Sequence, residues 1–446
     1  MNVATRQDER AAFARFVDGE VLRLLSMGAT SFTNLLRRLP SVYPTELLSS
    51  IERLLARCAI PASLAERIRC EATQAGNDRP EGRSLLPLPH PLDFEWRFTF
   101  DAARDLLNLA TELTPSDGDV LLFGTPGLAV EALSLPTSRR LSFLGEDNIV
   151  TRRLMALNHA TGSPLSIAFC GDALPQATAD AVLVDPPWYM DFIRPMLEAA
   201  AAACRLGGVV LVSLPPIGTR PSAGADLAAT IRFAARLGLD LIHHQPLTIS
   251  YDTPFFETNA LSAAGVHASS RWRRGDLIVL RKARSTSRLS PPVRGRRREW
   301  VEASIDRMRL FIRIDTDADA GTGFEGLIPL IGGNVLPSVS RRDFRRRHAQ
   351  VWTSGNRIFR TDNPALVFEA ALSHGAEAFG SGLQPRLWGN LRECEALEWF
   401  SEELHALAVL EASEERGSPA IVPEWSGHWI SSSTRFCSAS AATLSG

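Results

Sequence analysis

Hydrophobic positions follow the period of helices over residues 8–73. Apolar side chains recur there at intervals of three and four residues, and the pattern breaks at Gly28 and Pro40. Pro44 then suits the first turn of a third helix, where its missing N–H leaves no hydrogen bond unmade. Helices in this order predict a helical module over residues 1–75 that is similar to a winged-helix unit. Such a unit serves either DNA binding or packing, including the formation of a homodimer.

The pattern changes between residues 96 and 283, after a linker over 76–95 that is rich in proline and glycine. Short apolar strands alternate there with amphipathic helices; the predicted strands are DVLLFG, RLSFLGED, LSIAFCGD, ADAVLVDPPW and GGVVLVSLPP. This alternation is typical of a parallel sheet that is covered by helices on both faces. The two late strands DLIHHQPLTISY and DLIVLRK predict an antiparallel hairpin at the end of that sheet.

The last part of the chain mixes the two patterns after a basic linker over residues 284–299. RMRLFIRID, VLPSV and QVWTSGNRIFR predict strands, whereas PALVFEAALSHG and LRECEALEWFSEELHALAVLEA predict helices. We therefore expect a C-terminal α+β domain over residues 300–430. The polar end of the chain, residues 431–446, is expected to be a loose tail.

The composition is that of an ordinary globular protein. Hydrophobic residues make up 45% of the chain and charged residues 22%, which excludes a disordered or fibrous protein. No run approaches the roughly 18 consecutive apolar residues of a membrane-spanning helix, so no membrane partner is predicted. The opening MNVATRQDERAAFARF holds no apolar core of a secretion signal, and we expect a cytoplasmic protein.

Lysine and cysteine usage excludes several kinds of site. Lys282 is the single lysine among 48 basic residues, and it lies in no phosphate-binding loop motif, which excludes a P-loop nucleotidase. The six cysteines form neither a CxxC motif nor a cluster with histidines at zinc spacing. We therefore expect buried or incidental thiols and no metal site.

The segment ADAVLVDPPW carries the clearest chemistry. An apolar strand ends there in the predicted catalytic residues Asp185, Pro186, Pro187 and Trp188. In open α/β sheets, ligands bind at this carboxyl end of the strands. The Asp185 carboxylate and the Pro186 carbonyl can each accept an N–H bond from an amino group, and the two prolines make the loop rigid. Trp188 offers an aromatic face on which a flat substrate can stack.

This segment resembles motif IV, the DPPW-type loop, of class I S-adenosylmethionine-dependent methyltransferases that act on amino nitrogens. The resemblance implies a Rossmann-like, doubly wound α/β sheet for residues 96–283 and S-adenosyl-L-methionine as the cofactor. Four further segments resemble other motifs of this family and occur in the expected order. The cofactor-binding residues that the resemblance implies are Phe98, Thr99, Gly124, Thr125, Gly127, Glu146, Asp147 and Asp172.

Each of these segments has an implied role. WRFTF resembles motif X, whose helix start faces the methionine carboxylate of the cofactor. The loop FGTPG, which contains Gly124, resembles motif I, although it has one glycine fewer than the usual pattern and no acidic residue. Asp147, with Glu146 close behind, would hold the ribose hydroxyls, and Asp172 would accept from the adenine amino group.

The leading prediction for the activity is methyl transfer to an amino nitrogen, with adenine N6 of DNA or RNA as the favoured acceptor. The layout of the chain also resembles the branched-chain polyamine synthases, which transfer an aminopropyl group. A polyamine needs a strongly acidic pocket, whereas only Asp191 and Glu198 are acidic close to the DPPW segment. Alkylation of a protein side chain, or a catalytically silent binding partner in a multi-protein system, remains as a further alternative.

The segment YDTPFFETNAL near the end of the sheet supplies three candidate substrate-binding residues: Tyr251, Phe255 and Phe256. Packing in the core would account for these aromatic side chains equally well. The nearby run Trp272, Arg273 and Arg274 precedes the last strand and is interpreted as a solvated rim.

Charge is distributed unevenly along the chain. Residues 285–350 contain thirteen arginines against eight acidic residues, and residues 361–424 contain twelve acidic residues against three arginines. The dense runs at 294–298 and 341–347 favour contacts with the phosphates of a nucleic acid, although a solvated face is the simpler interpretation. Nucleic acid is thus the predicted macromolecular partner.

Overall fold

The computed structural model describes residues 3–74, 85–135, 138–170, 177–285, 300–314, 326–373, 378–379 and 391–417. Two compact units make up the chain, one of residues 1–295 with 337–339 and the other of residues 296–336 with 340–446. The expected tail over 431–446 lies outside the described residues. The same holds for residues 76–84 of the first expected linker and 286–299 of the second.

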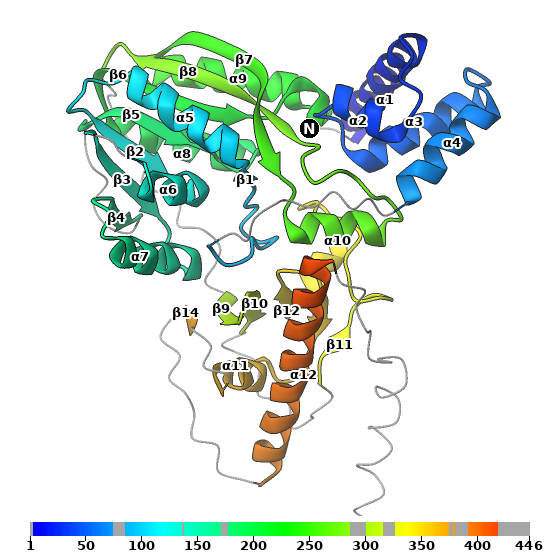
Figure 1. Ribbon diagram of the computed structural model, residues 1–446. Helices are drawn as coiled ribbons and strands as arrows, with labels where there is room; N and C mark the ends of the chain where they lie inside the picture. The colour runs from blue at the N-terminus through cyan, green and yellow to red at the C-terminus, as the bar shows by residue number, and fades with distance from the viewer. Residues whose placement is uncertain are drawn as a thin grey trace, which may run out of the picture. The chain divides into compact units, whose positions relative to one another are not determined.

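The first unit is built on an eight-stranded mixed sheet (Figure 1). Its strands are β1 (Arg97–Phe98), β2 (Asp119–Phe123), β3 (Arg140–Gly145), β4 (Ser166–Phe169), β5 (Ala179–Val184), β6 (Cys204–Leu214), β7 (Leu239–Asp252) and β8 (Arg274–Lys282). The spatial order is β1-β7-β8-β6-β5-β2-β3-β4. Strands β4, β3, β2, β5 and β6 are parallel neighbours, whereas β8 runs antiparallel to both β6 and β7. The Rossmann-like sheet and its final antiparallel hairpin are thus confirmed.

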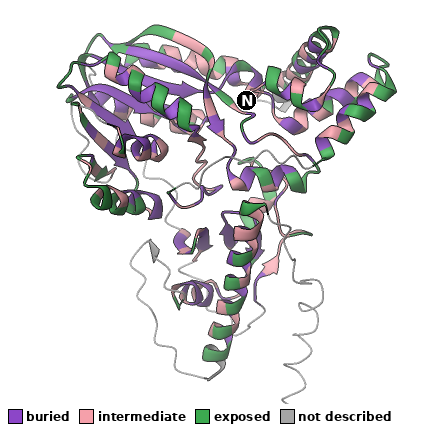
Figure 2. Cartoon of the chain, viewed as in Figure 1, coloured by how far each residue is buried: buried purple, intermediate pink, exposed green. Residues whose placement is uncertain are grey.

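Helices cover both faces of this sheet. They are α5 (Phe100–Glu112), α6 (Pro126–Leu133), α7 (Ile149–Thr161), α8 (Met190–Ala203) and α9 (Ala223–Arg236). Helices α5, α6 and α7 pack into one hydrophobic core, and α8 and α9 pack into a second core. Successive residues of β2 alternate between the two cores, and all six residues of β5 are buried. Figure 2 shows these central strands buried beneath partly exposed helices, as expected for parallel strands that are covered on both sides.

Lys282 ends strand β8 inside this unit. Its side chain is only 3% exposed, and its ammonium Nζ donates a hydrogen bond of 2.9 Å to the carbonyl of Leu237. The single lysine of the chain therefore joins β8 to the end of α9.

The N-terminal module contains four helices rather than three: α1 (Val3–Ser26), α2 (Phe32–Arg38), α3 (Pro44–Ala56) and α4 (Ala62–Thr73). Pro44 is the first residue of α3, as the sequence predicted. A winged-helix unit would continue into a two-stranded wing, whereas a fourth helix follows here and residues 3–74 contain no strand. Glu71 of α4 accepts hydrogen bonds from the backbone N–H groups of Phe32 and Thr33 at 2.8 and 3.1 Å, so α4 holds the start of α2.

A further helix, α10 (Phe255–Ala263), lies between β7 and β8. The sequence placed YDTPFFETNAL within the late hairpin, but only its first two residues belong to β7. Pro254 directly precedes the helix, and proline restricts the backbone to angles that suit such a start. Val266 and Trp272, from the connection after α10, pack into the core of the helical module.

The second unit contains a six-stranded sheet in the order β11-β13-β12-β10-β9-β14. Its elements are β9 (Trp300–Ile305), β10 (Met308–Arg313), β11 (Ile328–Pro329), β12 (Val351–Thr353), β13 (Ile358–Arg360), α11 (Pro364–Ser373), β14 (Ala378–Phe379) and α12 (Leu391–Arg416). Every described pairing in it is antiparallel. The sequence anticipated β10, β12, β13, α11 and α12 but missed β9, β11 and β14, and VLPSV contributes only an isolated bridge between Val335 and Arg357.

Among the helices that the structure describes, none is both long enough and apolar enough to cross a membrane.

Candidate active site

The register of the parallel strands brings several loops to one edge of the first sheet. Phe123 of β2 pairs with Leu144 of β3 on one side and with Val184 of β5 on the other. The residues that follow these strands therefore begin three adjacent loops, about 5 Å apart from strand to strand. The chain runs from β2 outward to β4 and then returns to β5, so the strand order reverses between β2 and β5. Such a reversal is where open α/β sheets bind their ligands.

Gly124 makes the turn after β2. Its φ of +65° lies in the left-handed region, and its N–H donates to the carbonyl of Leu144 at 2.9 Å. A Cβ at this position would lie 3.1 Å from the terminal methyl of Met196. Glycine is therefore favoured both by the backbone angle and by the space available.

Thr125 and Gly127 lie at the start of α6. Thr125 is buried, and its Oγ1 has no hydrogen-bond partner among the described residues. No side chain caps α6, so the N–H groups of its first turn remain as donors at the positive end of the helix. An anionic group such as a carboxylate would satisfy these donors, and the loop therefore fits the methionine end of the implied cofactor.

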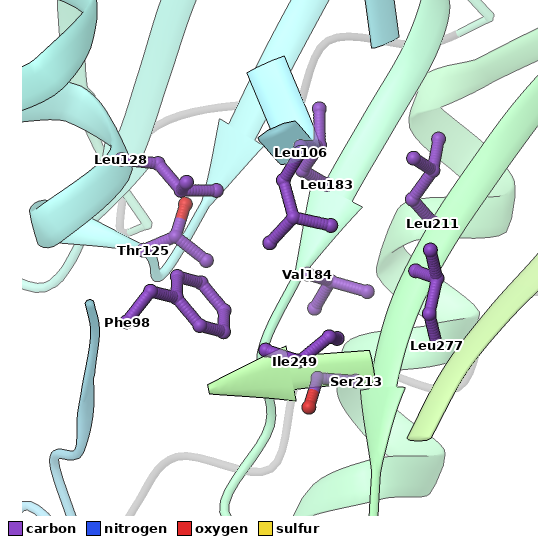
Figure 3. A pocket seen from close by; sticks show the side chains of 10 residues that line it. All are labelled: Phe98, Leu106, Thr125, Leu128, Leu183, Val184, Leu211, Ser213, Ile249 and Leu277. Atoms are coloured by element: carbon purple, nitrogen blue, oxygen red, sulfur yellow. The ribbon is translucent and has the colours of Figure 1, made fainter. Parts of the chain in front are cut away.

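A small cavity lies beside Thr125 and is closed by apolar side chains (Figure 3). Its volume of about 10 Å³ is enough for a single water molecule. Thr125 and Ser213 provide the polar groups of its wall. The cavity is therefore a packing void rather than a ligand-binding pocket.

Glu146 and Asp147 follow β3 and are both exposed. Arg152 donates hydrogen bonds to both carboxylate oxygens of Asp147, at 2.8 and 3.1 Å. Asn148 caps α7 by accepting from the N–H of Thr151 at 2.9 Å. Glu146 directly follows β3, whereas Asp147 is hydrogen-bonded to Arg152 of α7. Asp172, the predicted adenine ligand, lies outside the described residues.

Phe98 and Thr99 lie where the first edge strand meets α5. Thr99 is buried and caps α5 by accepting from the N–H of Ala102 at 3.3 Å, and its own N–H donates to the carbonyl of Ser250 at 3.0 Å. The ring of Phe98 lies 5.0 Å from the ring of Tyr251 between centroids. These contacts attach the start of α5 to β7, beside the DPPW segment.

Asp185 is the central polar residue of the DPPW segment. The Tyr251 hydroxyl donates a hydrogen bond of 2.8 Å to its Oδ1 and is also hydrogen-bonded to Ser213 Oγ. Burial raises the pKa of Asp185 to about 7, although these hydrogen bonds and the charge of Arg273 act in the opposite direction. Burial also raises the pKa of Tyr251 well above its ordinary value, so its hydroxyl remains a donor at neutral pH.

The rest of the segment forms the wall next to this carboxyl group. Pro186 is buried, Pro187 is half-buried, and the Pro187 carbonyl accepts from the N–H of Tyr189 at 2.6 Å. The indole of Trp188 is 8% exposed and meets the Tyr251 ring edge-on, with centroids 5.7 Å apart. All four predicted catalytic residues thus lie in one loop beside Tyr251.

Arg273 is a site residue that the sequence analysis missed. Its guanidinium carbon lies 4.1 Å from the ring centroid of Trp188 and 4.2 Å from that of Trp96, so the cation contacts two indoles. The neighbouring Trp272 is buried rather than part of a solvated rim. Because β8 is antiparallel, its beginning lies at the edge where the parallel strands end. The predicted hairpin is the sequence signal for this placement, because Arg273 directly precedes its second strand.

The other two candidate substrate-binding residues lie in α10. Phe255 is half-buried, whereas Phe256 is 2% exposed and packs inside the protein. Glu257 follows them and is fully buried, and its Oε1 accepts a hydrogen bond from the Tyr43 hydroxyl of the helical module. Burial raises the pKa of Glu257 to about 7.

Known proteins resemble this chain at low sequence identity. No protein-family model matches it, and no curated protein sequence matches it significantly. It is similar in structure to the branched-chain polyamine synthase from Thermus thermophilus in complex with N4-aminopropylspermidine and 5'-methylthioadenosine, with 16% identity, a TM-score of 0.47, and coverage of 66% of this chain and 97% of that one. The C9 mutein of that synthase gives a TM-score of 0.48 at the same identity and coverage. A methyltransferase from Pyrococcus furiosus shows 13% identity and a TM-score of 0.27, over 40% of this chain and 83% of that one. The function has to be inferred from the site itself.

The raised pKa of Asp185 predicts a pH-dependent effect of the Asp185→Asn substitution on stability. In the unfolded chain this carboxyl group ionises near pH 4, whereas in the folded protein it ionises near pH 7. Ionisation therefore lowers the free energy of unfolding as the pH rises through this window, and asparagine removes the effect. Urea unfolding should show the variant gaining on the wild type by on the order of 2 kcal/mol between pH 4 and pH 8. A difference that is independent of pH would contradict the burial of this carboxyl group.

Proposed function

We propose that this protein is a class I S-adenosylmethionine-dependent transferase that alkylates an amino nitrogen. One observation carries the proposal: the glycine turn at Gly124 and the half-buried Asp185 follow paired strands at the reversal of the strand order. The glycine turn suits the amino-acid end of the cofactor. The carboxyl group suits the acceptor amine, which must lie beside the cofactor.

The cofactor side of the site is formed by the loops after β2 and β3. The turn at Gly124, the unpartnered Oγ1 of Thr125 and the uncapped start of α6 would hold the carboxylate and amine of the methionine moiety. Glu146 is our candidate for the ribose hydroxyls, because it directly follows β3 at the edge of the sheet where ligands bind. Asp172 remains the predicted ligand of the adenine amino group. When bound, S-adenosylmethionine supplies an electrophilic methyl sulfonium.

The acceptor side of the site is formed by Asp185 and the aromatic side chains around it. Above pH 7 the ionised carboxylate accepts an N–H bond from the acceptor amine, and the Pro186 carbonyl can accept a second one. Tyr251 fixes the orientation of the carboxylate through Oδ1, and Ser213 also stabilises its charged form by hydrogen bonding. A carboxyl group that titrates near neutral pH can also take up the proton that the alkylated nitrogen releases. No metal is needed for these steps, because positioning and hydrogen bonding account for them.

For the acceptor we propose adenine N6 of a nucleic acid, whose base would lie beside the wall that Trp188 forms with Arg273. Of the two arginine runs, the one at 294–298 lies outside the described residues. In the other run, Arg345 is paired with Asp343 and Arg346 stacks on the ring of Trp352. Arg342 and Arg347 are exposed, and these two support phosphate contacts best.

The alternative acceptor, a polyamine, is disfavoured by the charge of the pocket. The cation of Arg273 lies against Trp188, next to the place where an acceptor amine would meet Asp185. A polycationic substrate would be repelled there, because like charges in a partly desolvated pocket interact strongly. No specific observation favours the two remaining alternatives, which are alkylation of a protein side chain and a catalytically silent binding role.

The assignment of the ribose ligand predicts different effects for two neighbouring substitutions. Titration calorimetry with S-adenosylhomocysteine should show binding to the wild type and a loss of about tenfold for Glu146→Ala, the cost of roughly one charge-assisted hydrogen-bond partner. Asp147→Ala is the matched control and should bind nearly as the wild type, because its carboxylate serves Arg152. If the wild type binds neither this ligand nor S-adenosylmethionine nor its decarboxylated form, the proposed activity is wrong.

The role of Asp185 predicts loss of transfer without loss of the cofactor. Asp185→Ala should lower the rate of radiolabelled methyl transfer by about 100-fold or more, which is the usual effect of removing one hydrogen bond that stabilises a transition state. Its affinity for S-adenosylhomocysteine should stay within about twofold of the wild type, because Asp185 lies on the acceptor side. The wild-type rate should rise with pH through about 7 as the carboxyl group ionises. Full activity of Asp185→Ala would refute this role.

A nucleic-acid acceptor predicts binding that weakens steeply with salt. Gel-shift affinity for DNA or RNA should fall between low and physiological salt, and the double substitution Arg342→Ser with Arg347→Ser should weaken it for all sequences alike. Arg345→Ser serves as the control, because its guanidinium is already paired with Asp343. Absence of any salt-sensitive binding, with methyl label appearing on protein or a small amine instead, would exclude nucleic acid.

A further inference from the structure

The guanidinium of Arg273 is held by aromatic contacts, and none of the described residues is its hydrogen-bonding partner. Trp96 and Trp188 lie within cation–π distance of it, and together they fix its position. In the part of the chain that the structure describes, its side chain makes no hydrogen bond and no ion pair within 4.0 Å. Arg273 is half-buried, and none of its nitrogens belongs to the fully buried polar atoms that lack a partner, so its N–H groups are open to solvent or to a ligand.

Two carboxyl groups lie near this cation but do not neutralise it by direct contact. Glu257 of α10 and Asp185 both act on Arg273 through their charge. Glu257 is itself engaged by the Tyr43 hydroxyl, and its second oxygen, Oε2, is buried without a hydrogen-bond partner. The remaining ionisable groups that face Arg273 are the phenols of Tyr251 and Tyr189. No described residue thus accepts from the N–H groups of Arg273, which remain donors for a ligand.

The contacts of Arg273 with two indoles indicate what kind of ligand its guanidinium can bind. The two indoles attract the charge of the guanidinium but accept none of its conventional hydrogen bonds, so its N–H donors remain for a ligand. These donors form a fork that matches the paired oxygens of a carboxylate or a phosphate. A structural ion pair would instead bring an acidic side chain into contact with the fork, and none of the described residues does so.

We propose that Arg273 binds an oxyanion, a carboxylate or a phosphate, that the acceptor carries in addition to the amine held by Asp185. The proposal rests on the function proposed above and narrows its substrate class to amines with an attached anion. Trp96 and Trp188 act as positioning residues for the guanidinium, and Tyr43 and Glu257 hold the wall behind it. Neutral amines and polyamines lack the group that Arg273 recognises.

The experiment measures whether an added oxyanion strengthens binding. Wild-type protein with S-adenosylhomocysteine is titrated calorimetrically with two matched pairs, adenosine against adenosine 5'-monophosphate and aniline against 4-aminobenzoate. We expect the anionic member of at least one pair to bind about tenfold tighter or more, the usual gain from a charge-assisted hydrogen-bonded pair. The nucleotide arm reports a phosphate and the benzoate arm reports a carboxylate. Spermidine should neither bind measurably nor compete.

Substitutions at Arg273 test whether this residue is the source of the preference. Arg273→Gln should abolish it, and Arg273→Lys should retain part of it, because lysine keeps the charge but loses the fork. Arg274→Gln is the matched control: this neighbour is exposed and donates to the carbonyl of Leu247 instead. The affinity for S-adenosylhomocysteine should be unchanged in all three variants, which separates recognition of the acceptor from a general loss of folding.

Glu257→Gln provides a test that leaves Arg273 in place. At pH 8 the wild-type Glu257 is ionised and offsets the cation, so the glutamine variant should bind the anionic probe several-fold tighter. At pH 6 the wild-type group is mostly protonated, and the two proteins should bind alike. Glutamine keeps an oxygen that can accept from Tyr43, so the wall is preserved.

Equal affinity for both members of both pairs in the wild type, or an unchanged preference in Arg273→Gln, would overturn the proposal. Competition by spermidine would also overturn it. Failure to bind S-adenosylhomocysteine while the preference for the anion persists would instead refute the proposed transferase activity and leave anion binding at Arg273 standing.

Discussion

The parallel pairing of β2 with β5 is the constraint on which the rest of the site depends. Phe123 lies opposite Val184, so a tight turn at Gly124 and a polar residue at 185 leave the sheet side by side. Shifting this register by one residue would turn every side chain of β5 to the other core, and both cores are densely packed. The burial of alternate residues on two faces therefore keeps the two halves of the site within reach of each other.

The antiparallel strand β8 brings its amino-terminal end to the ligand-binding edge of the sheet. Parallel neighbours present only their carboxyl ends at the ligand-binding edge, whereas β8 presents its beginning there. That reversal brings Arg273 to Trp188, and the hairpin partner β7 brings Tyr251 to Asp185. The helical module contributes Tyr43 to the same wall through Glu257. A site of this kind combines residues from the start, the middle and the end of the first unit.

Much of this fold could be predicted from the sequence, because its signals are local. An uninterrupted apolar run made β5 recognisable as a doubly covered strand, and Pro44 indicated the start of α3. The segment around Phe255 was different, since a short helix of nine residues with few polar positions has no clear helical period. Strand β9 was missed for a related reason: Trp300 follows directly on an arginine run that suggested a linker.

The candidate site was predictable only in part, because its contacts are distant in sequence. The DPPW segment can be recognised from four consecutive residues. In contrast, nothing in the sequence near Asp147 indicates that Arg152 would hold both of its oxygens. The position of Arg273 depends on strand order, which no local pattern encodes.

The packing of the first unit also buries the single lysine of the chain, Lys282. Because the only lysine side chain of the chain is bound inside to the carbonyl of Leu237, the protein's own surface offers no lysine nitrogen that could compete as an alkyl acceptor, and amine-directed labels would find no accessible lysine to modify.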